Sequence, residues 1–278
     1  MSKKVIIIKI ASTIMMLVLA LVIIYPLIFV LITSFKTNED VILNPFGMAT
    51  FQPGNYLVAW NSAKVGIYFM NSAIVTLVSL TAQTIIAIMA GYALGKLKVW
   101  GHQIIMTAFL AVMMVTSEMT IIPNFITIKN FGLMNTYWSL ILPYIVGVAG
   151  GLVLGIYIVS NFVKTIPKEL DEAAIIDGAG IIDILLKVDI PLIKPVISTL
   201  IIFNFSAIWS EFYWALIVVK SEAIKTLPLG LINLQSQYSA NYGVLTAALV
   251  ILSVPVMAIY IIFSKHFIAG ATAGALKG

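Results

Sequence analysis

Long uncharged stretches dominate the pattern of hydrophobic and polar residues along this chain. A helix needs about 20 apolar residues to cross about 30 Å of hydrocarbon. Four stretches longer than this contain no charged residue: 10–35, 65–95, 130–163 and 226–264. Two more, near 103–123 and 196–219, are apolar except for one glutamate each, Glu118 and Glu211.

The pattern predicts an all-α membrane protein whose chain crosses the membrane six times. The first apolar segment is longer than the core of a signal peptide, about 7–15 residues, and has no small-residue cleavage site, so we expect it to be retained as a helix. The six expected transmembrane helices are 10–33, 69–95, 103–123, 137–163, 196–219 and 243–265.

Composition supports this interpretation and excludes several other classes. Hydrophobic residues make up 61% of the chain and charged residues 10%, against about 25% charged in soluble domains. The 16 basic residues are scattered singly, unlike those of a nucleic-acid-binding surface. Because the chain has no cysteine and no histidine pair of the HExxH type, we expect no metal site and no cysteine nucleophile.

The lysines also predict an orientation, because cytoplasmic loops of membrane proteins carry an excess of basic residues. With the N-terminus inside, eleven of the 16 lysines lie on the inner side. We therefore expect both termini to be cytosolic. Residues 34–68 should then form a long outer connection, 164–195 a long inner connection, and 266–278 a cytosolic tail.

The inner connection carries the sequence signals of short helices. Pro167 suits a first helical position, the acidic residues within 169–172 suit the first turns, and Gly178 suits the left-handed residue that ends a helix. A second short helix is expected over about 181–190, ending at Pro191. One face of the first helix carries one large apolar residue and smaller neighbours: Leu170, Ala173, Ala174 and Asp177. Either a docking surface for another protein or an amphipathic connection on the membrane surface fits this pattern.

The same connection resembles the EAA motif of the permeases of binding-protein-dependent ABC importers. The matching residues are Glu172, Ala173, Ala174, Gly178, Val188, Ile190 and Pro191. Other segments are similar to the smaller permease of maltose-type carbohydrate transporters: 55–56, 71–72, 122–123, 209–212, 225–231 and 270–278. The resemblance covers the chain from about residue 20 to its end.

This resemblance implies one permease domain over 1–278, which moves a sugar or oligosaccharide across a bacterial-type cytoplasmic membrane as a multi-pass subunit. It implies a heterodimer with a second permease subunit, two ATPase subunits that bind ATP and Mg, and an extracytoplasmic solute-binding protein. The chain itself would be non-catalytic and would hold no cofactor. Its one stretch similar to a phosphate loop, 91–97, lacks the required spacing and the Ser or Thr that reaches magnesium.

The resemblance also implies which residues meet the ATPase subunits, with Glu172 facing a basic residue of the partner. The residues expected to couple the chain to the ATPase are Glu172, Ala173, Ala174, Asp177, Gly178 and Pro191. The tail is expected to reach the same interface through Gly270, Gly274, Lys277 and Gly278.

The two acids inside the expected spans are candidates for the solute path, because a buried acid costs several kcal/mol unless it is paired or hydrated. Each lies 15 residues into its expected helix, which places it roughly 22 Å from the inner edge. Polar and aromatic side chains suit sugar hydroxyls and sugar ring faces, and a role in gating or packing is the alternative. The candidate path residues are Glu118, Asn204, Trp209, Glu211 and Tyr213.

Two other function classes stay open. An ion-coupled secondary transporter would need charges near the membrane midplane, and an intramembrane hydrolase would need a Ser–His or paired-Asp site within the spans. Small residues spaced by four also predict close helix packing, either inside the subunit or between subunits. These glycines are Gly91 with Gly95, and Gly147 with Gly151 and Gly155.

Overall fold

The computed structural model describes residues 3–47, 49–97, 99–237 and 241–275. Every regular element within these ranges is helical, as the apolar pattern predicts. The chain forms two compact units, 1–67 with 230–253 and 68–229 with 254–278. Each unit is described by itself, and the single domain expected over 1–278 stays a prediction.

The first unit begins with the apolar helix α1. The most apolar part of its membrane-length segment, Ile8–Thr33, has no buried residue. It also contains α2, α3 and a π-helical turn at Val58–Ser62. Three helices, α4, α14 and α15, belong to it only in part, because they cross its boundaries. The helices concerned are α1 (Lys3–Thr33), α2 (Asn38–Leu43), α3 (Gly54–Leu57), α4 (Val65–Lys96), α14 (Leu227–Gln237) and α15 (Tyr242–Ala275).

Buried charged groups organise the connection that follows α1. The Lys36 ammonium, 1% exposed, donates hydrogen bonds to the carbonyls of Asn44 (2.8 Å) and Pro45 (3.1 Å). The Asp40 carboxylate accepts from the backbone N–H groups of Ala49 and Thr50 at 3.0 Å each. Because both charges are satisfied within the connection, they stabilise its fold and are not free for a solute.

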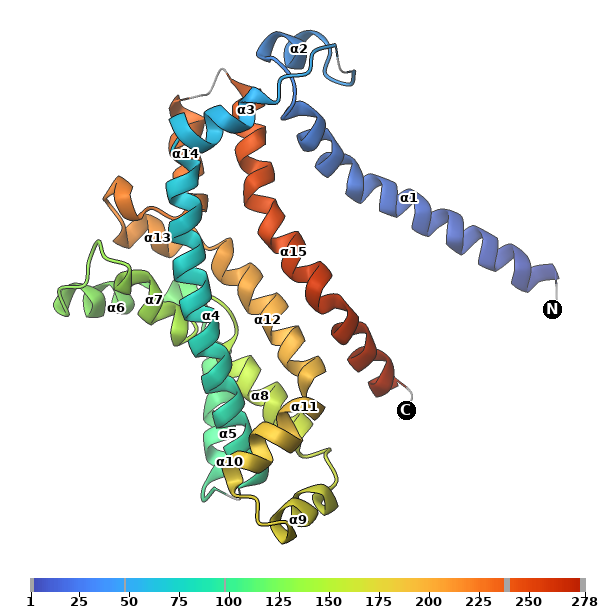
Figure 1. Cartoon of the computed structure of the whole chain (residues 1–278), viewed down its shortest axis with the longest axis vertical. Coiled ribbons are helices and arrows are strands. Elements are labelled where there is room, and N and C mark those ends of the chain that lie inside the picture. Colours follow the sequence, from blue (N-terminus) through green and yellow to red (C-terminus); the bar gives the residue numbers. More distant parts are fainter. Residues whose placement is uncertain (1–2, 48, 98, 238–240, 276–278) are drawn as a thin grey trace. The chain divides into compact units, whose positions relative to one another are not determined.

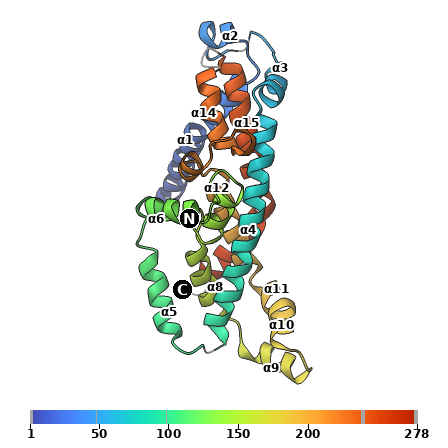
Figure 2. The same ribbon diagram turned by 90° about the vertical axis from the view of Figure 1, so that its left-hand side faces the viewer.

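The second unit contains the remaining helices, with a π-helical turn at Leu185–Asp189 and a 3-10 turn at Glu222–Ile224. Figures 1 and 2 show how these helices are arranged along α4. They are α5 (His102–Val112), α6 (Ser117–Asn130), α7 (Trp138–Ile145), α8 (Leu152–Val163), α9 (Lys168–Ile176), α10 (Ile181–Ile184), α11 (Ile190–Leu192), α12 (Lys194–Trp209) and α13 (Tyr213–Val218).

The core of the second unit forms where α4, α8 and α12 meet, and glycines set the distance between α4 and α8. A Cβ added at Gly91 would lie 2.6 Å from Val159 Cβ, and one at Gly95 would lie 2.7 Å from the carbonyl oxygen of Ser160. Gly155 on α8 faces Ala87 of α4 in the same way, at 3.2 Å. For these three glycines the structure favours packing inside the subunit over packing between subunits.

Four described helical segments are long and apolar enough to cross a membrane, and a fifth is added if a bent helix pair counts as one span. The four are Ile8–Thr33, Val65–Lys96, Lys194–Val218 and Tyr242–Lys265, and they correspond to four of the six expected helices. The expected total of six continuous helices is not confirmed, because the segments at 103–123 and 137–163 are each broken.

The first break lies between α5 and α6, whose axes differ by 99°. Thr116 is extended and starts α6, and Glu118 lies in the first turn, where an acid is favourable to the helix dipole. The second break, 146–151, separates α7 from α8, and Gly147 and Gly150 adopt positive φ there. Gly147 and Gly151 therefore do not belong to a helix-packing stripe, contrary to the sequence prediction.

A third, shorter break at 210–212 separates α12 from α13 within the segment expected at 196–219. These breaks also correct the depth assigned to Glu118. The value of roughly 22 Å assumed 1.5 Å of rise per residue along one straight helix, and the 99° bend before α6 removes that basis.

Candidate functional site

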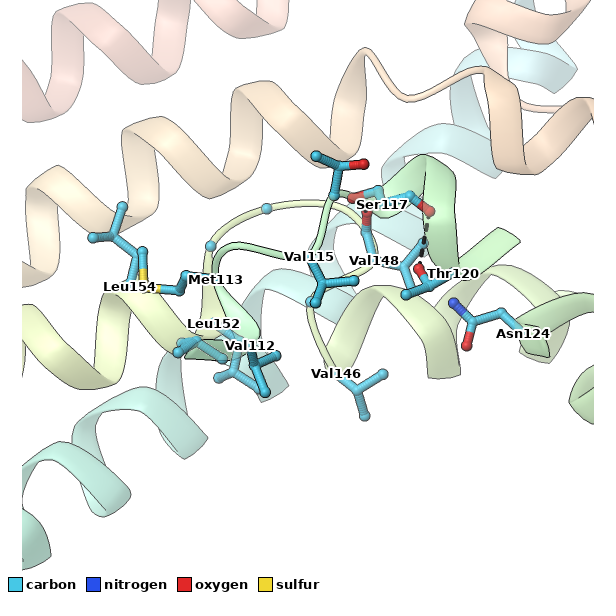
Figure 3. Close-up of a pocket in the computed structure, with 15 residues that line it drawn as sticks. Val112, Met113, Val115, Ser117, Thr120, Asn124, Val146, Val148, Leu152 and Leu154 are labelled. Carbon is cyan, nitrogen blue, oxygen red and sulfur yellow. Dashed lines mark hydrogen bonds between the residues drawn. The ribbon is translucent and has the colours of Figure 1, made fainter. Parts of the chain in front are cut away.

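Two neighbouring open cavities lie beside the breaks in the expected membrane spans of the second unit. The larger, of about 560 Å³, lies between the ends of α5 and α6 and the 146–151 break. In Figure 3, Ser117, Thr120 and Asn124 lie at one end of it, and apolar side chains such as Met113 and Leu152 lie at the other. Irregular backbone at membrane depth is tolerated where it is buried in protein or lines a hydrated cavity, which fits this arrangement.

The smaller cavity, of about 250 Å³, brings together three of the five candidate path residues: Glu118, Glu211 and Tyr213. It adjoins the larger cavity, because Ser117, Val148 and Gly150 line both. Tyr213 is 72% exposed. An acid of α6, an acid of the 210–212 break and the phenol ring of Tyr213 in α13 therefore share one recess.

Glu211 is held in place by three hydrogen bonds. Its carboxylate accepts from the backbone N–H groups of Trp214 (2.7 Å) and Ala215 (3.3 Å) and from the hydroxyl of Tyr144, which is 1% exposed. The carboxylate thus satisfies the first N–H groups of α13, which have no partner within the helix. This explains how an acid is accommodated here, and it gives Glu211 a structural role as well as a place at the cavity wall.

The other two candidate path residues lie behind the cavities and are not among the residues that line them. Asn204, 2% exposed, accepts a hydrogen bond from the backbone N–H of Gly151 at 2.8 Å. Trp209, also 2% exposed, packs against the rings of Phe69 and Phe205, with centroids 5.4 and 5.6 Å away. Asn204 supports the break, and Trp209 belongs to the core.

Sequence reasoning missed a second support of the 146–151 break. Gln83 of α4 is fully buried and donates to the carbonyls of Tyr144 (3.1 Å) and Ala149 (3.2 Å). A glutamine near the middle of the expected span 69–95 was the available signal, since a buried amide in a membrane helix needs a partner.

The predicted coupling segment lies at one end of the second unit, and α9 projects beyond the end of α4 (Figures 1 and 2). Pro167 precedes the first helical residue, one position earlier than predicted, and Gly178 has φ +83° and follows the helix as predicted. None of the residues of α9 is buried. Glu172, Ala173 and Asp177 are exposed, and Ala174 is partly exposed.

The second predicted helix of this segment is irregular. It consists of α10, a π-helical turn and α11, which run without a gap from Ile181 to Leu192 and so end one residue after Pro191, where the helix was expected to stop. In the tail, Lys277 and Gly278 lie outside the described residues, and the backbone of Gly270 and Gly274 belongs to α15.

An ion cluster at the base of α9 was also missed. The Lys96 ammonium lies 2.7 Å from the Asp171 carboxylate and 2.6 Å from the Asp189 carboxylate. Asp189 is fully buried, and this burial raises the pKa of its carboxyl, although the ion pair with Lys96 acts in the opposite direction. The three residues are far apart in the sequence, so no local pattern could have joined them.

Several apolar helices of membrane-spanning length, together with broken helices around a cavity, define a multi-pass membrane protein of the transport class. Residues 83–271 match the family described as the inner membrane component of binding-protein-dependent transport systems. The chain belongs to this family, and the predicted resemblance to permeases of ABC importers is confirmed.

Relatives match along most of the chain. It is 31% identical to the diacetylchitobiose uptake system permease protein NgcG of Streptomyces coelicolor, over 93% of this chain and 85% of that protein. It is 33% identical to the sulfoquinovosyl glycerol transport system permease protein SmoH of Agrobacterium fabrum, over 91% and 89%. These relatives are permease components, so the expectation of a permease subunit and not an enzyme is confirmed.

A solved structure shares the fold. A chain of a bacterial ABC transporter involved in the import of the acidic polysaccharide alginate superposes with a TM-score of 0.82. The match covers 96% of this chain and 99% of that chain at 22% identity.

Proposed function

We propose that this chain is the permease subunit of an ATP-driven importer that moves a sugar or an oligosaccharide across the cytoplasmic membrane of a bacterial-type cell. Its partners would be a second permease subunit, two ATPase subunits that bind ATP and Mg, and an extracytoplasmic solute-binding protein. Support for a carbohydrate cargo comes from the two relatives above, whose names give diacetylchitobiose and sulfoquinovosyl glycerol as their solutes.

The exposure of α9 is the observation that carries the proposed coupling to the ATPase. The helix contains the apolar side chains of Leu170, Ile175 and Ile176, which are 44%, 59% and 86% exposed. The Glu172 carboxylate is also exposed, and among the described residues it has no ion-pair partner. Ile175 and Ile176 follow Glu172 by three and four residues, so they share its side of the helix. An apolar surface with an unpaired acid suits a partner that offers a basic residue within an apolar cleft.

The proposed topology has six membrane crossings, with both termini and residues 164–195 in the cytosol and 34–68 outside. The excess of lysines on the inner side supports it. Ala179→Cys tests it in a chain that contains no other cysteine. An impermeant thiol reagent should label this site in inside-out vesicles and not in intact cells, and the reverse result would overturn the topology.

The two cavities are the proposed place where the solute passes this subunit. Glu118 and Tyr213 offer a carboxylate and an aromatic ring at an exposed wall, which are the groups that suit sugar hydroxyls and sugar ring faces. Glu211 lies at the same wall, already bound to α13. The solute contacts of this subunit would then involve residues beside the break before α6 and beside the break at 210–212.

The decisive experiment reconstitutes the complete complex in vesicles and measures uptake of labelled oligosaccharides. Uptake should require both ATP and the solute-binding protein, and it should persist when ion gradients are collapsed. Glu172→Gln should lower uptake, while Glu169→Gln, an equal change at another exposed acid of α9, should leave it nearly unchanged. Uptake driven by an ion gradient without ATP would favour the alternative, a secondary transporter.

A further inference from the structure

The cluster of Lys96, Asp171 and Asp189 joins three parts of the second unit through one ammonium group. Lys96 is the last residue of α4, Asp171 lies in α9, and Asp189 ends the π-helical turn before α11. The Lys96 ammonium donates to both carboxylate oxygens of Asp171, at 2.8 and 2.7 Å, and to one oxygen of Asp189 at 2.6 Å. Two segments on opposite sides of the turn at Gly178 therefore meet at the end of α4.

The two acids are in different environments. Asp189 has a fully buried side chain, so it holds the ammonium from inside the fold, whereas the Asp171 side chain is 19% exposed, at the edge of the cluster. Among the described residues, Asp171 is the only residue of α9 that forms an ion pair with another helix. Since α9 has no buried residue, apolar packing does little to fix its position relative to α4.

On the other side of the cluster, α4 is an uninterrupted helix that contacts the 146–151 break. Gly91 and Gly95 bring it into close contact with α8. Gln83 lies 13 residues before Lys96, about 20 Å along the helix, and it binds the carbonyls of Tyr144 and Ala149 at the 146–151 break. A displacement of the Lys96 end of α4 would therefore act on the backbone that encloses the larger cavity.

We propose that Lys96 is a positioning residue, and that its ion pair with Asp171 transmits movement of α9 through α4 to the cavity wall at 146–151. This inference rests on the proposed function, in which the ATPase subunits dock on α9. It assigns the two acids separate tasks: Asp189 keeps Lys96 in place, and Asp171 connects α9 to it.

The test compares a charge-removing and a charge-keeping substitution of Asp171 in the reconstituted complex, with uptake per ATP hydrolysed as the readout. Asp171→Asn should lower this ratio by roughly 5-fold or more, the lower end of ordinary coupling between sites. Asp171→Glu keeps the charge and should retain most of the ratio. Asp183→Asn is the matched control, because the ion pair of Asp183 with Lys187 is on an exposed surface, where such pairs contribute little.

A second measurement separates this inference from the proposed function. Ile176→Cys, at an 86% exposed position, should form a cross-link with the ATPase subunit. If the cross-link forms and Asp171→Asn leaves uptake per ATP unchanged, the role of Lys96 is refuted while the docking of α9 stands. If no cross-link forms in an otherwise unchanged chain, the docking surface itself is wrong, and the inference is overturned with it.

Loss of the complex in Asp171→Asn would leave the ratio unmeasurable, so a third measurement uses the full-length chain alone. Spin labels at Ile175→Cys and Trp100→Cys, 59% and 95% exposed, report the position of α9 relative to the segment after α4. Asp171→Asn should broaden the distance distribution, and Asp171→Glu should not. An unchanged distribution in Asp171→Asn would show that the ion pair does not position α9.

Discussion

Alanine substitutions at Gly91 and Gly95 should separate α4 from α8. A Cβ at Gly95 would lie 2.7 Å from the carbonyl oxygen of Ser160, and one at Gly91 would lie 2.9 Å from the carbonyl oxygen of Ile156. Both obstacles are backbone atoms of α8, so no rotation of a side chain can relieve the overlap. The two helices would have to move apart by roughly 1 Å to reach ordinary contact distances.

Two opposing effects decide the magnitude. Overpacking of a well-packed interior costs about 1–3 kcal/mol, while replacing glycine by alanine inside a helix contributes roughly 1 kcal/mol of stability. We expect each substitution to lower the free energy of unfolding by about 1–2 kcal/mol, because the backbone overlap outweighs the gain in helix propensity. Gly155→Ala should cost less, since its Cβ would lie 3.2 Å from the Ala87 methyl group.

Thermal unfolding of the purified chain in detergent measures these differences. Gly54→Ala is the matched control, because the nearest heavy atom to its Cβ would be 4.0 Å away, on the flexible side chain of Gln52. Relative to this control, Gly95→Ala should unfold at a temperature lower by about 5 °C. Equal unfolding temperatures for Gly95→Ala and Gly54→Ala would show that α4 and α8 are not packed as closely as described.

Four further changes test the coupling segment and the cavity. Glu172→Lys should abolish stimulation of ATP hydrolysis by the solute-binding protein, with Glu172→Ala milder, and full stimulation in the lysine variant would exclude docking on a basic residue. Gly178→Val should weaken pull-down of the ATPase subunit, because a β-branched residue at φ +83° is strained; unchanged pull-down would show that this turn is not needed. Glu211→Ala should destabilise the chain by about 1–3 kcal/mol by leaving buried donors unpaired, and Glu211→Gln, which keeps an acceptor, should be closer to the wild type in thermal unfolding. Burial raises the pKa of Asp189, so the contribution of this group to stability falls as pH rises through its folded-state pKa. Asp189→Asn should remove that decline from the dependence of Tm on pH. If the variant and the wild type show the same dependence of Tm on pH, the raised pKa of Asp189 is contradicted.

The uncharged stretches were sufficient to predict the long helices, because hydrophobic length is a direct requirement of the bilayer. They could not predict the breaks. Thr116 and Glu118 form an ordinary helix-start signal, but an apolar average over the whole stretch conceals it. The glycines at 147, 150 and 151 fit a packing stripe equally well in sequence, and only their backbone angles distinguish a break from a continuous helix.

The coupling segment was predicted in more detail because its signals are local. Gly178 ends α9 with a positive φ, as a glycine at that position suggests. The contact between Lys96 and Asp171 depends on residues 75 positions apart, and no periodicity connects them. The sequence thus predicted the helix that we propose to dock, and the fold was required to show what holds that helix.

The main role of the polar residues inside the spans is to form hydrogen bonds with backbone groups at the helix breaks. Each break leaves backbone groups without helical partners, and in hydrocarbon an unpaired group costs several kcal/mol. Glu211 binds N–H groups of α13, Asn204 binds the N–H of Gly151, and Gln83 binds two carbonyls at the 146–151 break. Loss of transport on removing one of these side chains would therefore not distinguish solute contact from collapse of the cavity wall. Glu118 and Tyr213 are the candidates whose exposed side chains leave them available to meet a solute.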